Sequence, residues 1–71
     1  MISEEKVRQV NLNLATPDEL ESLPSIGPVL AKRIVDYRQQ NGGFKTIEDI
    51  KKVQGIGNKI FGSIKNYITV N

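Results

Sequence analysis

The amino-acid sequence predicts an all-α fold, a compact helical bundle of two tandem units that each read helix, tight turn, helix. Three observations lead to this prediction. The chain repeats itself at an offset of 30 residues, apolar residues recur at helical spacing within each copy, and Gly or Pro interrupts both copies at the same point. Because neither unit could bury its apolar face alone, we expect the two units to share one core.

The repeat covers most of the chain. The stretch "TPDELESLPSIGPVLAKRIVDY", which begins at Thr16, lies over "TIEDIKKVQGIGNKIFGSIKNY", which begins at Thr46. Identical in the two copies are Thr16 and Thr46, Ile26 and Ile56, Gly27 and Gly57, Ile34 and Ile64, and Tyr37 and Tyr67. We expect the units at about residues 16–40 and 46–68, in a domain of residues 10–71 that follows a flexible leader of residues 1–9. A duplication kept for packing alone would leave this pattern, and so would a paired binding surface.

Each unit is expected to open with a short helix of about two turns. Thr16 and Thr46 are favourable N-caps, and acidic residues follow each of them. The acidic residues of these first turns are interpreted as capping groups and not as catalytic carboxylates; they are Asp18, Glu19, Glu48 and Asp49. The inward apolar residues, spaced three apart, are Leu20 and Leu23 in the first unit and Ile50 and Val53 in the second.

An extended segment is expected before the first helix, because Val10, Leu12 and Leu14 alternate with polar residues and would pack on the bundle. The two turns, "PSIG" at 24–27 and "QGIG" at 54–57, interrupt the units. Three glycines there can adopt positive φ at low cost, namely Gly27, Gly55 and Gly57. The isoleucine of each turn, Ile26 or Ile56, is expected to point into the core.

The second helices are expected from about Pro28 to Gln40 and from Asn58 onward. Their inward residues follow a helical period: Leu30, Ile34 and Tyr37 in the first unit, and Ile60, Phe61, Ile64 and Tyr67 in the second. Between the units, "NGG" at 41–43 is a strong helix stop, and Phe44 is expected to enter the core behind it.

The composition excludes several functional classes. The chain has no Cys and no His, which removes disulfides, thiolate metal sites and His-based catalytic triads. With no base, nucleophile or metal cluster in view, we expect neither an enzyme nor a metal protein. No apolar run approaches the roughly 20 residues that span a bilayer, and no signal peptide follows Met1. Residues 1–21 carry a net charge of −3 and residues 22–71 a net +5, which suits a polyanionic partner.

Both turns have the features of an anion-binding site. A Gly-containing turn that opens onto a helix leaves backbone N–H groups pointing one way, with the helix dipole behind them. The donors would come from residues 25–29, without Pro28, and from residues 55–59. Cations follow each turn: Lys32 and Arg33 in the first unit, Lys59 and Lys65 in the second. A single Gly turn beside a solvated Lys is often structural, but its repetition favours anion binding.

These residues resemble a known motif. "LPSIGPVLAKRI" and "VQGIGNKIFGSI" resemble the helix-hairpin-helix motif, and with the "NGGFK" link the chain is similar to the ComEA family of competence DNA receptors over about residues 10–70. The resemblance implies a double helix-hairpin-helix domain with pseudo-twofold symmetry. Such domains bind double-stranded DNA without sequence specificity, and their two hairpins hold one phosphate on each strand across the minor groove.

The resemblance also implies the site and the partners. Carried over by position, the phosphate contacts are Ser25, Ile26, Gly27 and Val29, supported by Lys32 and Arg33, and Gly55, Ile56, Gly57 and Lys59. We expect a monomer with DNA as partner, other DNA-uptake proteins as further partners, and no small-molecule substrate. Some similar domains hold a monovalent cation on the hairpin carbonyls, which the sequence leaves open; no other cofactor is implied.

Three matters stay open at this point. Ser25 stands where the family usually has Gly, so Ser25 would be strained if its backbone requires positive φ. Family members are usually membrane-anchored or exported, so a fragment of such a receptor would lie outside the bacterial cytoplasm, whereas a shorter relative would lie inside it. The alternative function is a protein–protein interaction module that has lost DNA binding, as in the similar photosystem II extrinsic protein PsbU.

Overall fold

The computed structural model describes residues 9–70 of the chain. The leader expected over residues 1–9 therefore lies, but for Gln9, outside the described residues. The elements in chain order are β1 (Val10–Asn11), α1 (Pro17–Glu21), α2 (Pro28–Asn41), the 3-10 helix η2 (Ile47–Lys52), α3 (Asn58–Ile64), the 3-10 helix η3 (Lys65–Tyr67) and β2 (Ile68–Thr69). The predicted helical fold is confirmed, with a very small sheet added to it.

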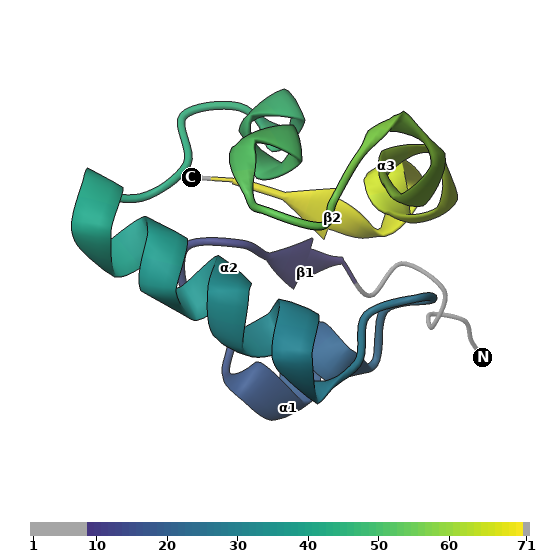
Figure 1. Cartoon of the computed structure of the whole chain (residues 1–71), viewed down its shortest axis with the longest axis horizontal. Helices are drawn as coiled ribbons and strands as arrows, with labels where there is room; N and C mark the ends of the chain where they lie inside the picture. Colours follow the sequence, from purple (N-terminus) through teal and green to yellow (C-terminus); the bar gives the residue numbers. More distant parts are fainter. Residues whose placement is uncertain (1–8, 71) are drawn as a thin grey trace, which may run out of the picture.

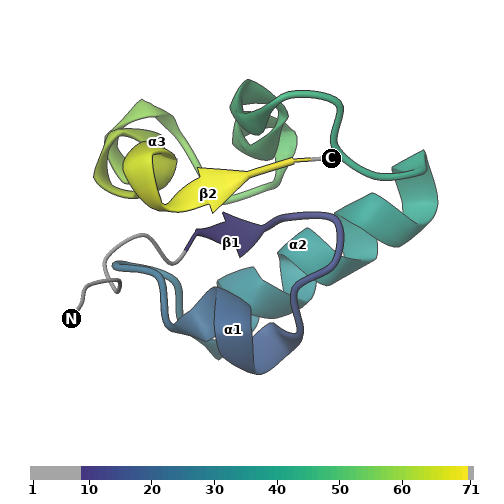
Figure 2. The same ribbon diagram turned by 180° about the vertical axis from the view of Figure 1, so that it is seen from behind.

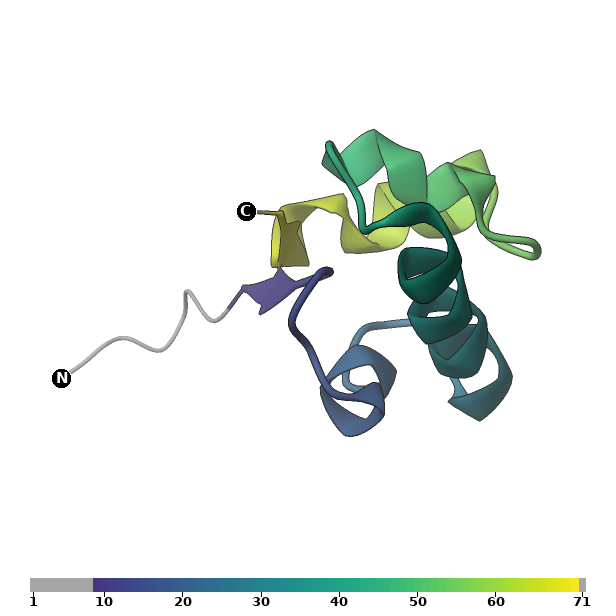
Figure 3. The same cartoon turned by 90° about the vertical axis from the view of Figure 1, so that its left-hand side faces the viewer.

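The two units lie on either side of this sheet. Figure 1 shows α1 and α2 on one side of the β1–β2 pair, with α3 and the preceding 3-10 helix on the other. The view from behind shows the same division (Figure 2). After a quarter turn, the strand pair and α2 lie at opposite sides of the molecule (Figure 3). The strands are parallel, with Val10 opposite Ile68 and Asn11 opposite Thr69, so they join the two ends of the described chain.

Side-chain hydrogen bonds at the N-terminus define where the first helix of each unit begins. Thr16 accepts a hydrogen bond from the amide of Glu19, and Glu19 Oε1 accepts from the amide of Thr16, which completes the predicted capping box. In the second unit, Asp49 accepts from the amides of Lys45 and Thr46 at 3.0 and 3.2 Å. Helices this short have little stability on their own, so they depend on the burial of Leu20 in the first unit and Ile50 in the second.

The short helix expected at the start of the second unit is present, and it is a 3-10 helix. Its apolar residues Ile47, Ile50 and Val53 are spaced three apart, and a 3-10 helix has three residues per turn, so they fall on one line. Ile50 and Val53 are buried and Ile47 is half-buried along that line. The spacing of the apolar residues therefore matches the tighter helix.

The second helices differ in length. α2 begins at Pro28 as predicted and ends at Asn41, where Gly42 with φ 76° forms a left-handed C-cap. α3 stops at Ile64 and passes into η3, which turns Tyr67 outward. The prediction that Tyr67 points inward is wrong, because 51% of it is exposed. Its counterpart Tyr37 is half-buried and stacks on Phe44.

The segment before α1 is only partly as predicted. Leu12 is buried and Val10 half-buried, but Leu14 is 75% exposed. The chain turns after Asn11, because the amides of Leu14 and Ala15 both donate to the Asn11 carbonyl. This turn ends the alternation that an extended segment would have continued, so the inward packing expected of Leu14 is wrong.

One core joins the elements of residues 9–70. Both hairpin isoleucines, Ile26 and Ile56, are buried as predicted, and so is Phe44. The buried apolar residues of this described part are Leu12, Ala15, Leu20, Leu23, Ile26, Ala31, Ile34, Phe44, Ile50, Val53, Ile56, Ile64 and Ile68. Because both units contribute to this cluster, the two hairpins are anchored in the same core.

Candidate nucleic-acid interface

The two hairpins, residues 23–27 and 53–57, share one backbone conformation. The amide of Ile26 donates to the Leu23 carbonyl at 3.2 Å, and the amide of Ile56 donates to the Val53 carbonyl at 3.0 Å. Within these turns Ser25 has φ 66° and Gly55 has φ 96°. A four-residue turn with positive φ at its third residue is the pattern of a type II turn, which favours Gly there. Ser25 thus occupies a left-handed conformation, which costs a residue with a Cβ roughly 1–2 kcal/mol.

The outer glycines, Gly27 and Gly57, are not needed for their backbone angles. Their φ values are −99° and −106°, so the expectation of positive φ holds for Gly55 but is wrong for these two. A Cβ built on either residue would meet nothing within 4 Å. Neither strain nor crowding inside the protein therefore requires glycine at these positions. What glycine does provide there is an uncovered backbone in front of α2 and α3.

The isoleucines act as anchors of the hairpins. Their side chains are buried and their amides close the turns, so the amides of Ile26 and Ile56 are already paired. Of the predicted donors, this leaves the amides of Ser25, Gly27 and Val29 in the first hairpin region and of Gly55, Gly57, Asn58 and Lys59 in the second. None of these seven amides has an acceptor within the described residues 9–70. They are the backbone donors that a ligand could use.

The predicted cations divide between the hairpins in an unexpected way. Lys32 forms an exposed ion pair with Asp36 on the next turn of α2, at 3.0 Å. Arg33 was expected to support the first hairpin, and its Nη1 donates to the carbonyl of Gln54 in the second hairpin, at 3.1 Å. Lys59 is exposed in the first turn of α3. The link from Arg33 to Gln54 has no signal in the sequence, because the two residues belong to different units.

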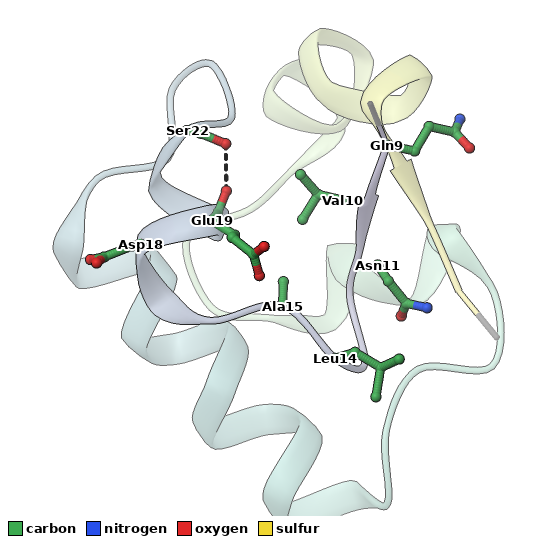
Figure 4. A pocket seen from close by; sticks show the side chains of 8 residues that line it. All are labelled: Gln9, Val10, Asn11, Leu14, Ala15, Asp18, Glu19 and Ser22. Carbon is green, nitrogen blue, oxygen red and sulfur yellow. Dashed lines mark hydrogen bonds between the residues drawn. The ribbon is translucent and has the colours of Figure 1, made fainter. Parts of the chain in front are cut away.

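Negative charge gathers at α1. Asp18, Glu19 and Glu21 are exposed there, and α1 contains no Lys or Arg. A shallow pocket of about 620 Å³ lies between β1 and α1. Figure 4 shows Glu19 close to Ala15 inside this pocket, while Asp18 is directed away from the other labelled side chains. The pocket is lined by Gln9, Val10, Asn11, Leu14, Ala15, Asp18, Glu19 and Ser22. With carboxylates and no cation in its lining, it is unsuited to a phosphate.

Within residues 9–70, no three His, Cys, Asp or Glu side chains come together in a way that could hold a metal ion. No helix in this part of the chain has both the length and the apolar character needed to cross a membrane. The paired hairpins are therefore the best-defined candidate site in the described residues.

Comparison with known proteins points to the same motif. A family profile described as "Helix-hairpin-helix motif" matches residues 5–69. The chain is 54% identical over 61 residues to ComE operon protein 1 of Bacillus subtilis (strain 168), an alignment that covers 86% of this chain and 30% of that protein.

Two further relatives are animal proteins. Endonuclease/exonuclease/phosphatase family domain-containing protein 1 of Homo sapiens is 40% identical over 63 residues, 89% of this chain and 11% of that protein. Kinesin-like protein KIF22 of Danio rerio is 43% identical over 61 residues, 86% of this chain and 10% of that protein. The chain thus spans less than a third of the length of each of these three relatives.

Proposed function

Because this chain belongs to the helix-hairpin-helix motif family, we propose that it binds double-stranded DNA without sequence specificity, through backbone amides of its two hairpins. Each hairpin would hold a phosphate of one strand, so that the pair spans the minor groove. Since one chain supplies both hairpins, a monomer is sufficient for this grip. The proposal makes the domain a binding module and not an enzyme.

One observation carries the proposal: both hairpins leave free backbone amides beside an uncovered glycine. Gly27 and Gly57 have ordinary backbone angles and open space where a side chain would stand. A phosphate oxygen could approach the amides there without meeting a Cβ, which explains a glycine that the fold itself does not require. The buried isoleucines Ile26 and Ile56 hold the donors in place beforehand, which lowers the entropic cost of binding.

The charge distribution supports the same partner. Residues 22–71 carry a net charge of +5, whereas the first 21 residues carry −3. Lys59 and Lys65 are exposed on α3 and η3, and Lys32 is exposed on α2. Contacts made to phosphates by amides and lysines carry no information about base sequence, so binding is expected to be unspecific.

The relatives suggest the biological process in which the chain takes part. The identity to ComE operon protein 1 and the resemblance to the competence DNA receptors support a role in bacterial DNA uptake, with other uptake proteins as partners. The monovalent cation on the hairpin carbonyls stays a prediction, which DNA titrations in potassium and in choline salts would test.

A duplex titration at several salt concentrations tests the proposal. With about four phosphates neutralised, the logarithm of affinity is expected to fall with the logarithm of salt at a slope near −3.6, and affinity itself should lie in the range of roughly 10⁻⁴ to 10⁻⁶ M. Duplexes of unrelated sequence should bind equally. Lys59→Ala should weaken binding and make the slope shallower by up to about 0.9. Absence of binding at low salt would favour the protein–protein module instead.

A further inference from the structure

The contact between Arg33 and Gln54 joins the two units. Arg33 lies on α2 in the first unit, and Gln54 belongs to the hairpin of the second. Within the described part of the chain, the bond from Arg33 Nη1 to the Gln54 carbonyl is the one hydrogen bond between residues 16–40 and residues 46–68. The two halves of the candidate site are thus tied together at a point next to one of the hairpins.

The second hairpin also rests directly on α2. A Cβ placed on Gly55 would lie 2.9 Å from Arg33 Nη1 and 2.9 Å from Leu30 Cδ2, so the backbone of Gly55 is in close contact with both side chains. Beside this contact, a cleft of about 180 Å³ separates α2 from residues 52–54, and both Arg33 and Gln54 line it. The hydrogen bond from Arg33 to Gln54 therefore lies between a close contact at Gly55 and an open cleft.

α2 connects this contact to the first hairpin. The helix runs without a break from Pro28 to Asn41, and its N-cap, Gly27, is the last residue of the first hairpin. The same rigid element therefore carries one hairpin at its start and holds the other through Arg33, less than two turns further on. Besides the shared core, α2 is therefore a direct link between the two sets of free amides.

We propose that Arg33 is a positioning residue that makes the domain prefer double-stranded over single-stranded DNA. This inference rests on the proposed function. A duplex presents the phosphates of its two strands at a fixed separation, so both hairpins bind it at full strength only when their own spacing is fixed. A single strand is flexible and adjusts to either spacing, so it gains much less from a preset arrangement.

A direct contact from Arg33 to a phosphate would behave differently. The side chain is exposed, and a positive charge near the hairpins attracts any nucleic acid backbone. Loss of such a contact would weaken duplex and single strand alike. Loss of the bond to Gln54 would weaken the duplex more, because it would release the second hairpin from α2. The ratio of the two affinities therefore separates the two roles.

The test compares Arg33→Gln with Lys32→Gln in the full chain. Each variant removes one positive charge from an exposed position on α2, but only Arg33 is bonded to the second hairpin. Affinities for a short duplex and for one of its strands are measured at low salt by fluorescence anisotropy, after thermal unfolding has shown that both variants are folded. Amide hydrogen exchange is followed in the free proteins at Ile56, whose amide closes the second hairpin.

For Arg33→Gln we expect the duplex-to-single-strand affinity ratio to fall about tenfold, the effect of one lost hydrogen bond from a charged donor. Exchange at Ile56 should become faster, because its bond to the Val53 carbonyl opens more often. Lys32→Gln should lower both affinities together and leave both the ratio and the exchange unchanged. An equal ratio in the two variants, or unchanged exchange in Arg33→Gln, overturns the inference while the proposed function stands. If the wild-type chain binds no duplex at low salt, the proposed function fails and this inference with it.

Discussion

Asn13 holds the backbone of Phe44 with both ends of its carboxamide. Its Oδ1 accepts from the amide of Phe44 at 2.6 Å, and its Nδ2 donates to the Phe44 carbonyl at 3.0 Å. The two residues are 31 positions apart, so this side chain fixes the link between the units against the segment that precedes α1. Phe44 is thereby held where its ring stacks on Tyr37, with ring centroids 5.0 Å apart.

Asn13→Ala is expected to destabilise the domain by about 1–3 kcal/mol, because two partly buried backbone groups lose their partners. The melting temperature of a domain this size would fall by about 4–8 °C for each kcal/mol. Asn41→Ala is the matched control, since Asn41 is exposed and makes its one side-chain bond within α2. Calorimetric melting curves check both variants. Equal melting temperatures for the two would show that the Asn13 clamp contributes nothing.

Ser25→Gly is expected to stabilise the domain by about 0.5–1 kcal/mol. Glycine relieves the left-handed strain at φ 66°, and this gain exceeds the extra chain entropy that glycine loses on folding. Ser63→Gly is a matched substitution at an exposed helical position of α3, where glycine should lower stability instead. Urea unfolding measures both, and a loss of stability in Ser25→Gly would contradict the assignment of strain to this residue.

Gly57→Val is expected to abolish most duplex binding while the protein stays folded. Its φ of −106° suits any residue and its Cβ would have open space, so the new side chain would project where a phosphate must approach. Gly62→Ala is the control, since Gly62 lies within α3 and also has room for a Cβ. That change should keep wild-type affinity and add up to about 1 kcal/mol of stability. Wild-type duplex affinity in folded Gly57→Val would exclude the second hairpin from the site.

Asp49 makes part of the stability depend on pH. Hydrogen bonds from the amides of Lys45 and Thr46, and then Lys52, hold the pKa of Asp49 below its usual 3.8. A carboxyl with a depressed folded-state pKa stabilises the fold above its unfolded pKa and loses this contribution as the pH falls through the folded value. The gap in unfolding free energy between wild type and Asp49→Asn should therefore be largest at neutral pH and close as the pH falls through the lowered pKa of Asp49.

Lys52→Met separates the two causes of this pH dependence. Nζ of Lys52 lies 3.3 Å from Oδ1 of Asp49, but both side chains are partly exposed to solvent. The hydrogen bonds from the amides of Lys45 and Thr46 lower the pKa of Asp49 more than Lys52 does. The variant should therefore keep most of the acid sensitivity of the wild type in urea unfolding at several pH values. Complete loss of that sensitivity would assign it to the ion pair and not to the cap.

The local features of the chain were predictable from the sequence because short-range physics sets them. The offset of 30 residues between Thr16 and Thr46 indicated two units, and the cap residue Thr16 predicted where the first helix begins. The buried positions of Ile26 and Ile56 followed from their place between small or turn-forming residues. Where the prediction was wrong, at Leu14 and Tyr67, the chain changed direction at a turn or a 3-10 segment that periodicity does not show.

The repeat could be read from the sequence by comparing the chain with itself. The helical units, the turns and the candidate donors were predictable as well, because each depends on residues within a few positions of one another. Which amides remain free became clear only in the folded chain, since Ile26 and Ile56 use theirs to close the turns. The tertiary structure also showed that Arg33 is hydrogen-bonded to the second hairpin and Asn13 to Phe44, and that β1 pairs with β2. These pairings join residues more than 20 positions apart, and which of them form depends on how two similar units pack around one core.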